Sequence, residues 1–130
     1  MPQLPCRVEG AVVEGLQLAR STGFPTANLS LLAFPNIEHG VYAAWTKIGT
    51  SDVCIPSVVF FGITYSIRHA SERFEVHLLD GNRELYGSSL AVELVHFIRH
   101  NKHFSKAEDL QMAIEKDVAD AKLFFTRVCV

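Results

Sequence analysis

The segment Thr22-Gly23-Phe24-Pro25-Thr26-Ala27-Asn28 lies between two apolar stretches that have the character of β-strands, and the rest of the chain is interpreted around it. Gly23 allows a tight turn or the close approach of a ligand, and Pro25 fixes one backbone dihedral angle. The Thr26 hydroxyl and the Asn28 amide can each bind a hard cation or a phosphate. The residues alone leave two interpretations open: an ordinary turn, or a site for a metal and nucleotide phosphates.

Composition indicates one folded domain that covers residues 1–130. Hydrophobic residues make up 48% of the chain and charged residues 20%, and the formal charge of -2 includes no long run of one sign. We therefore expect neither nucleic-acid binding nor a spanning helix or other membrane association. The three cysteines form no Cys-x-x-Cys pair and no secretory signal is evident, which favours a cytoplasmic protein; we expect a monomer.

Apolar patterning predicts several short strands and then one helix. The expected strands cover residues 7–14, 29–34, 41–48, 53–61, 73–79 and 85–99. The turn signal Asp80-Gly81-Asn82 predicts that the last two form a hairpin, and residues 62–71 are expected to be irregular. Apolar residues then recur at helical spacing from Leu110 to Phe125. This order predicts a closed β-barrel, or a sandwich, with a C-terminal helix packed on the sheet.

Two charged residues at the strands are candidates for chemistry. Glu75 lies in the middle of an alternating strand, either on an exposed polar face beside His77 or as a general base whose pKa is set by partial burial. Arg99 ends the last expected strand, where it can bind an anion or the carbonyl groups at a helix end. The histidines near it (His96, His100 and His103) are interpreted as scattered surface residues and not as a metal site.

The order of these features resembles the riboflavin kinase (flavokinase) family over nearly the whole chain, although the usual glycine-rich nucleotide-binding motifs are absent. The motifs that carry the resemblance are Gly23-Phe24-Pro25-Thr26-Ala27-Asn28, Gly40-Val41-Tyr42, Phe74-Glu75-Val76-His77-Leu78-Leu79-Asp80 with Leu85-Tyr86-Gly87, Phe97-Ile98-Arg99, and Lys102-His103-Phe104.

The resemblance implies a six-stranded antiparallel Greek-key β-barrel with a C-terminal α-helix packed on it. It also implies an enzyme that transfers the γ-phosphoryl group of ATP to the 5'-hydroxyl of riboflavin and so makes FMN. The implied metal is Mg²⁺, with Zn²⁺ or Mn²⁺ as alternatives. Because no adenylyltransferase domain precedes the barrel in this sequence, FAD synthesis is not expected.

The resemblance also implies roles for individual residues. Glu75 would be the base that accepts the hydroxyl proton, and Thr26 and Asn28 would hold the metal. The implied nucleotide and phosphate residues are Gly15, Arg20, Gly23, Pro25, Thr26 and Asn28. The implied flavin residues are Arg99, Phe104 and Tyr86, with Tyr65 and Phe97 as further aromatic candidates.

Some positions depart from the family pattern. The segment Gly62-Ile63-Thr64-Tyr65-Ser66 stands where the family usually has Asn-Pro followed by Thr or Tyr, and His100-Asn101 stands where it often has Pro-Glu. Ala19 stands where glycine is common. These departures leave a second function open, a non-catalytic flavin- or nucleotide-binding module on the same barrel. A third is a barrel that mediates only protein contacts.

Overall fold

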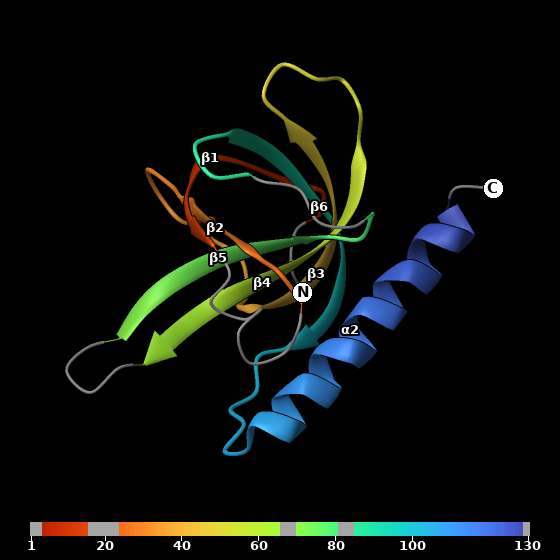
Figure 1. Cartoon of the computed structure of the whole chain (residues 1–130). Helices are drawn as coiled ribbons and strands as arrows, with labels where there is room; N and C mark the ends of the chain where they lie inside the picture. The colour runs from red at the N-terminus through yellow and green to blue at the C-terminus, as the bar shows by residue number, and fades with distance from the viewer. Residues whose placement is uncertain (1–3, 16–23, 66–69, 81–84, 129–130) are drawn as a thin grey trace.

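The structure, a computed structural model, describes residues 4–15, 24–65, 70–80 and 85–128. Strands and one C-terminal helix account for most of these residues (Figure 1). In chain order the elements are β1 (Cys6–Gly15), β2 (Ala27–Ser30), β3 (Gly40–Ile48), β4 (Ile55–Tyr65), β5 (Ala70–Leu78), β6 (Ser89–His100) and α2 (Ala107–Val128).

The strands form a closed antiparallel barrel in the order β1-β2-β5-β4-β3-β6. β3, β4 and β5 are consecutive neighbours, and the chain then crosses back so that β6 pairs with β3. A fourth strand beside the first of three consecutive strands is a Greek key. β6 also pairs with β1, which closes the barrel. The six-stranded Greek-key barrel with a terminal helix is therefore confirmed.

Three of the local expectations are wrong. The strand expected over residues 29–34 lies instead at β2 (Ala27–Ser30). No hairpin joins residues 73–79 to 85–99, because β5 pairs with β2 and β4 whereas β6 pairs with β1 and β3. Residues 62–71 are also not irregular throughout, since β4 and β5 stay in register from Gly62 opposite Arg73 to Tyr65 opposite Ala70. This paired end projects beyond the barrel (Figure 1), so it lacks the apolar alternation by which a half-buried strand is recognised.

Alternation along the strands separates an inner core from an outer one. Tyr42, Phe61, Phe74 and Leu94 are fully buried inside the barrel, where they contact inward side chains of β1 and β2. Each such side chain contributes about 1.5–3 kcal/mol by leaving water. Since the inner face of β5 is filled by Phe74 and its apolar neighbours, the residues between them must face outward.

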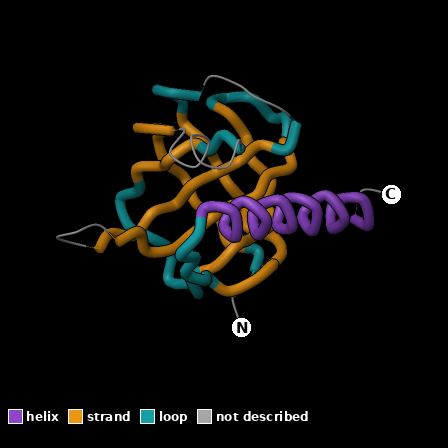
Figure 2. The backbone as a smooth tube through the Cα atoms, turned by 60° about the horizontal axis from the view of Figure 1, so that its bottom comes forward, coloured by secondary structure: helices purple, strands orange, loops and turns teal. Residues whose placement is uncertain are grey.

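The outer core lies between the barrel and α2, which runs across the outside of the strands (Figure 2). Val41 and Val58 of the barrel meet Ile114 and Phe125 of the helix. The buried helix residues follow the spacing of one helical face and are Ile114, Asp117, Val118, Ala121 and Phe125. A carboxylate thus lies within an otherwise apolar stripe.

Candidate functional site

A row of outward-facing residues crosses five strands of the barrel. Strand pairing places Asn28 opposite Glu75, Glu75 opposite Phe60, Phe60 opposite Val41, and Val41 opposite Arg99. Residues directly opposite one another in antiparallel strands share a face and lie close together. The row therefore brings the early Pro-Thr-x-Asn segment, the strand glutamate and the strand-end arginine to one surface of the molecule.

Glu75 lies near one end of this row, next to Asn28, in a nearly closed environment. It is only 9% exposed, and the Thr26 hydroxyl, itself 4% exposed, donates a hydrogen bond of 3.1 Å to its Oε1. Asn28 lies beside it on β2. The interpretation of Glu75 as part of an exposed polar face is therefore wrong, and the three polar residues Thr26, Asn28 and Glu75 form one cluster.

His77 fixes the backbone of the Pro-Thr segment. Its Nδ1 lies 2.7 Å from the Pro25 carbonyl oxygen, to which a protonated Nδ1 donates. Its ring also meets Phe24 edge to face, with 5.6 Å between the ring centroids. Burial lowers the pKa of His77, whereas the bond to Pro25 acts in the opposite direction and the charge of Lys122 adds slightly to the lowering. A neutral His77 thus anchors the carbonyl that immediately precedes Thr26.

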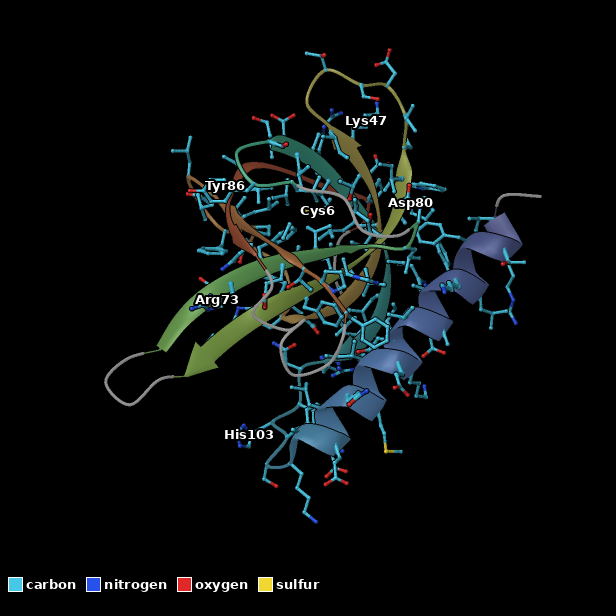
Figure 3. The ribbon with its side chains drawn as sticks, viewed as in Figure 1. Cys6, Lys47, Arg73, Asp80, Tyr86 and His103 are labelled. Carbon is cyan, nitrogen blue, oxygen red and sulfur yellow. The ribbon has the colours of Figure 1, made fainter. Side chains whose placement is uncertain are left out.

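A cleft of about 510 Å³ opens along the row between β5, β4 and the first turns of α2. Its floor includes Phe60 and Gly62, and its far wall is the loop that follows β6. In Figure 3, Arg73 lies on β5 and His103 lies in this loop, and both line the cleft. The charged and aromatic lining residues include Arg73, Glu75, Arg99, Lys102 and Phe104.

Arg99 lines the cleft, but its guanidinium group binds the helix. Its Nε and Nη2 each lie 2.7 Å from a carboxylate oxygen of Asp117, and Nη1 donates to the His100 carbonyl at 3.2 Å. The sequence left two interpretations of Arg99 open, binding of an anion and binding of the carbonyl groups at a helix end. The contact with Asp117 matches neither of them. Arg99 instead ties the end of β6 to the middle of α2. Sequence reasoning missed Asp117, although an acid within the apolar stripe of the helix was a visible signal.

The predicted flavin residues do not all gather at the cleft. Phe104 lines it, and the cations of Arg99 and Lys102 each lie 5.8 Å from its ring centroid. Phe97 instead packs against the inner core, with its centroid 5.2 Å from that of Tyr42. Tyr86 is 72% exposed and is not among the lining residues.

The length of β6 separates Tyr86, which precedes the strand, from Arg99 near its end. Figure 3 shows Tyr86 well away from His103. Gly15 ends β1 and pairs with Ala27 beside the Thr26 cluster. Arg20, Gly23 and the Tyr65 side chain lie outside the described part of the structure.

Asn101 is a second residue that the sequence did not single out for a role. Its Nδ2 donates to the Phe61 carbonyl oxygen at 3.0 Å, which attaches the loop after β6 to β4. A Cβ on Gly62 would lie 1.8 Å from that same nitrogen, so the amide occupies the space that glycine leaves. The two departures from the family pattern, at residues 62–66 and 100–101, thus meet in space at Gly62 and Asn101.

The cluster of Thr26, Asn28 and Glu75 suits a cation whose coordination is completed mainly by a bound small molecule. Among the described residues, no group of three or more His, Cys, Asp or Glu side chains could hold a metal alone. The Thr26 hydroxyl donates a hydrogen bond to Glu75, which leaves its oxygen lone pairs available, and Asn28 offers an amide oxygen on the same face. Mg²⁺ typically binds few protein oxygens, and phosphates and water complete its coordination shell.

The barrel thus places a buried glutamate, a Pro-Thr-x-Asn segment and an aromatic-lined cleft on one face. A family model described as Flavokinase: Riboflavin kinase matches residues 2–125. The chain therefore belongs to the riboflavin kinase family.

Related proteins agree with this assignment. The "Bifunctional riboflavin kinase/FMN adenylyltransferase" of Haemophilus influenzae is 38% identical over 121 residues, which are 93% of this chain and 39% of that protein. The human "Riboflavin kinase" is 32% identical over 128 residues, which are 94% of this chain and 82% of that protein. The chain thus spans about two fifths of the bacterial relative and most of the human one.

Solved structures share the fold. A Streptococcus pneumoniae protein titled "Macrolide-efflux Protein" has a TM-score of 0.77 and 28% identity, and the match covers 91% of this chain and 38% of that one. The riboflavin kinase of Trypanosoma brucei has a TM-score of 0.64 and 21% identity, with 92% and 79% covered. At that identity the second likeness concerns the fold alone. No helix in the described residues is long and apolar enough to cross a membrane.

Proposed function

We propose that this chain phosphorylates the 5'-hydroxyl of riboflavin with the γ-phosphoryl group of ATP, giving FMN and ADP. The observation that carries the proposal is the position of Glu75: buried, hydrogen-bonded to Thr26, opposite Asn28 and at one end of the cleft. The related proteins named as riboflavin kinases support the same substrates.

In this reaction Glu75 is the base. Its carboxylate accepts the proton of the 5'-hydroxyl as the hydroxyl oxygen forms a bond to the γ-phosphorus, and the bond from that phosphorus to the β,γ-bridging oxygen breaks. The Thr26 hydroxyl orients the carboxylate through a hydrogen bond to Oε1. Phosphoryl transfer depends mainly on positioning, which a carboxylate on a paired barrel strand provides.

Mg²⁺ is the proposed metal, with Mn²⁺ or Zn²⁺ as alternatives, and Thr26 and Asn28 are the residues that would hold it. A metal held there would supply positive charge to offset the negative charge that develops on the phosphates. Gly15 on β1 and Pro25 before β2 flank the cluster. Their backbone, together with Arg20 and Gly23, would position the nucleotide.

The opposite end of the cleft supports a flavin. A volume of about 510 Å³ is within the range of small-molecule sites, and Phe60 and Phe104 give it aromatic surface. The row from Asn28 to Arg99 crosses four strand intervals, or about 19 Å. That length allows the phosphates and the ring to occupy opposite ends with the ribityl chain between them. A monomer remains the expected state, and the free Cys6 and Cys54 suit a cytoplasmic setting.

The test is to incubate the purified chain with riboflavin, ATP and MgCl₂ and to separate the flavins by chromatography. We expect FMN to form in proportion to enzyme and to stop when EDTA is added. The contact of Asn101 with Gly62, at the two departures from the family pattern, motivates the second candidate, a flavin-binding module without activity. Tight flavin binding without any FMN would favour that module, and no flavin or nucleotide binding would exclude both.

A further inference from the structure

Arg73 is a cation in the cleft for which the reaction described above has no use. It lies on β5 two residues before Glu75, and it faces outward because Phe74 between them faces the inner core. Two residues along a strand span about 7 Å, so Arg73 and Glu75 are neighbours on one wall of the cleft.

Within the described residues, the buried Nε of Arg73 has no hydrogen-bond partner and Arg73 forms no ion pair. The adjacent acid, Glu72, is instead hydrogen-bonded to His39 at 2.8 Å. A buried donor without a partner costs free energy, and this one belongs to a charged group, so an anionic acceptor in the cleft would relieve the cost.

The cleft, with a volume of about 510 Å³, leaves room for such an acceptor. Arg73 lies opposite Gly62, where the Asn101 amide occupies the space that glycine leaves. The nearby amide of Asn101 uses its Nδ2 to bind the Phe61 carbonyl. The other cation that lines the cleft without a described ion pair is Lys102, in the loop on the opposite wall. Apart from Glu75, no carboxylate lines the described cleft. The positive charges that line the cleft therefore favour binding of an anion beside Glu75.

We propose that Arg73 binds the phosphate group of the product, so that the cleft holds flavin monophosphate more tightly than riboflavin. This rests on the proposed function, because a base at Glu75 requires the newly formed phosphate ester to lie next to it. A phosphate monoester carries nearly two negative charges at pH 7, and the planar arginine fork is matched to phosphate oxygens. The flavin ring would lie toward Phe104, on the wall away from β5, so Arg73 meets the phosphate end of the product.

The test compares FMN and riboflavin affinities by quenching of flavin fluorescence, with ADP and Mg²⁺ present. Arg73→Gln should weaken FMN binding about tenfold or more, as expected for loss of a charge-assisted bond, and leave riboflavin binding within about twofold. Arg73→Lys keeps the charge without the fork and should lie between the two. The matched control is Arg7→Gln, an exposed arginine that does not line this cleft.

Equal weakening of both flavins would overturn the assignment in favour of a contact with the ring, and unchanged FMN affinity would overturn it altogether. Circular dichroism checks that each variant folds. If Arg73→Gln does not fold, the FMN and riboflavin affinities of Arg73→Lys are compared with those of the wild type instead. If the wild-type chain binds neither flavin, the proposed function itself is refuted. That result is distinct from a substitution at Arg73 that has no effect.

Discussion

The ion pair between Arg99 and Asp117 makes a quantitative prediction, because its two partners differ in exposure. The Asp117 side chain is 2% exposed, whereas that of Arg99 is 27% exposed and borders the cleft. Two bonds of 2.7 Å join them, and they connect the end of β6 to the middle of α2. Replacing either partner removes the same two bonds but leaves a different charge behind.

Arg99→Met leaves the carboxylate of Asp117 buried without its partner, and breaking a buried pair in this way costs about 3–5 kcal/mol. Asp117→Asn leaves the guanidinium group of Arg99, which can reach water through the cleft. Its cost should be nearer the value of the lost charged hydrogen bonds, about 1.5–3 kcal/mol. Domains of this kind have about 5–15 kcal/mol of total stability, so Arg99→Met could consume a large share of it.

Urea unfolding followed by circular dichroism measures both costs. We expect a lower midpoint for Arg99→Met than for Asp117→Asn, with little change in the denaturant slope. The apolar double variant Arg99→Met/Asp117→Leu should be more stable than Arg99→Met alone, because it removes the stranded charge. Equal costs below about 1 kcal/mol, the range of exposed ion pairs, would refute the reasoning.

Three further outcomes follow from contacts around the site. Gly62→Ala should displace the Asn101 amide and cost about as much stability as Asn101→Ala, about 1 kcal/mol. The double variant should cost no more than either single change. Additive costs of the two changes in thermal unfolding would contradict the contact. Because burial lowers the pKa of His77, the unfolded chain takes up the proton first, so the contribution of His77 is complete above pH about 6.5 and is lost as pH falls below it. His77→Asn, which keeps a donor for the Pro25 carbonyl, should flatten this dependence in urea titrations between pH 5 and 8, and an unchanged slope would count against a buried neutral imidazole. Thr26→Val should weaken metal activation of FMN formation about ten- to hundredfold while Thr26→Ser stays near wild type, and identical Mg²⁺ curves would remove Thr26 from the metal site.

The sequence was most informative where a pattern repeats over many residues or carries a specific motif. The helical spacing from Leu110 to Phe125 predicted α2 and its buried face. Alternation around Glu75 correctly separated Phe74 and Val76 from the outer face. It could not show that Glu75 and His77 on this outer face are themselves contacted by Thr26 and Phe24, which lie far earlier in the chain.

The errors concern pairings that local signals do not encode. Asp80-Gly81-Asn82 is a strong turn signal, yet the strand that follows it crosses the barrel to pair with β1 and β3. Closure of the barrel determines that pairing. The contact of Arg99 with Asp117 was missed for the same reason, since it joins residues 18 positions apart on different elements. The flavin role of Tyr86 rests on its motif alone and stays a prediction, since Tyr86 precedes β6 whereas Arg99 lies near the other end of that strand.

The central claim is that Glu75, held by Thr26 beside Asn28, is the base for phosphorylation of riboflavin. The most direct measurement is the turnover number for FMN formation by Glu75→Gln at saturating riboflavin and Mg-ATP. The control is Glu9→Gln, an exposed carboxylate on β1. We predict that Glu75→Gln loses about 10²–10⁴-fold in turnover, the usual share of a general base, while it still binds flavin and Glu9→Gln keeps full activity. Wild-type turnover by a folded Glu75→Gln variant would contradict the account.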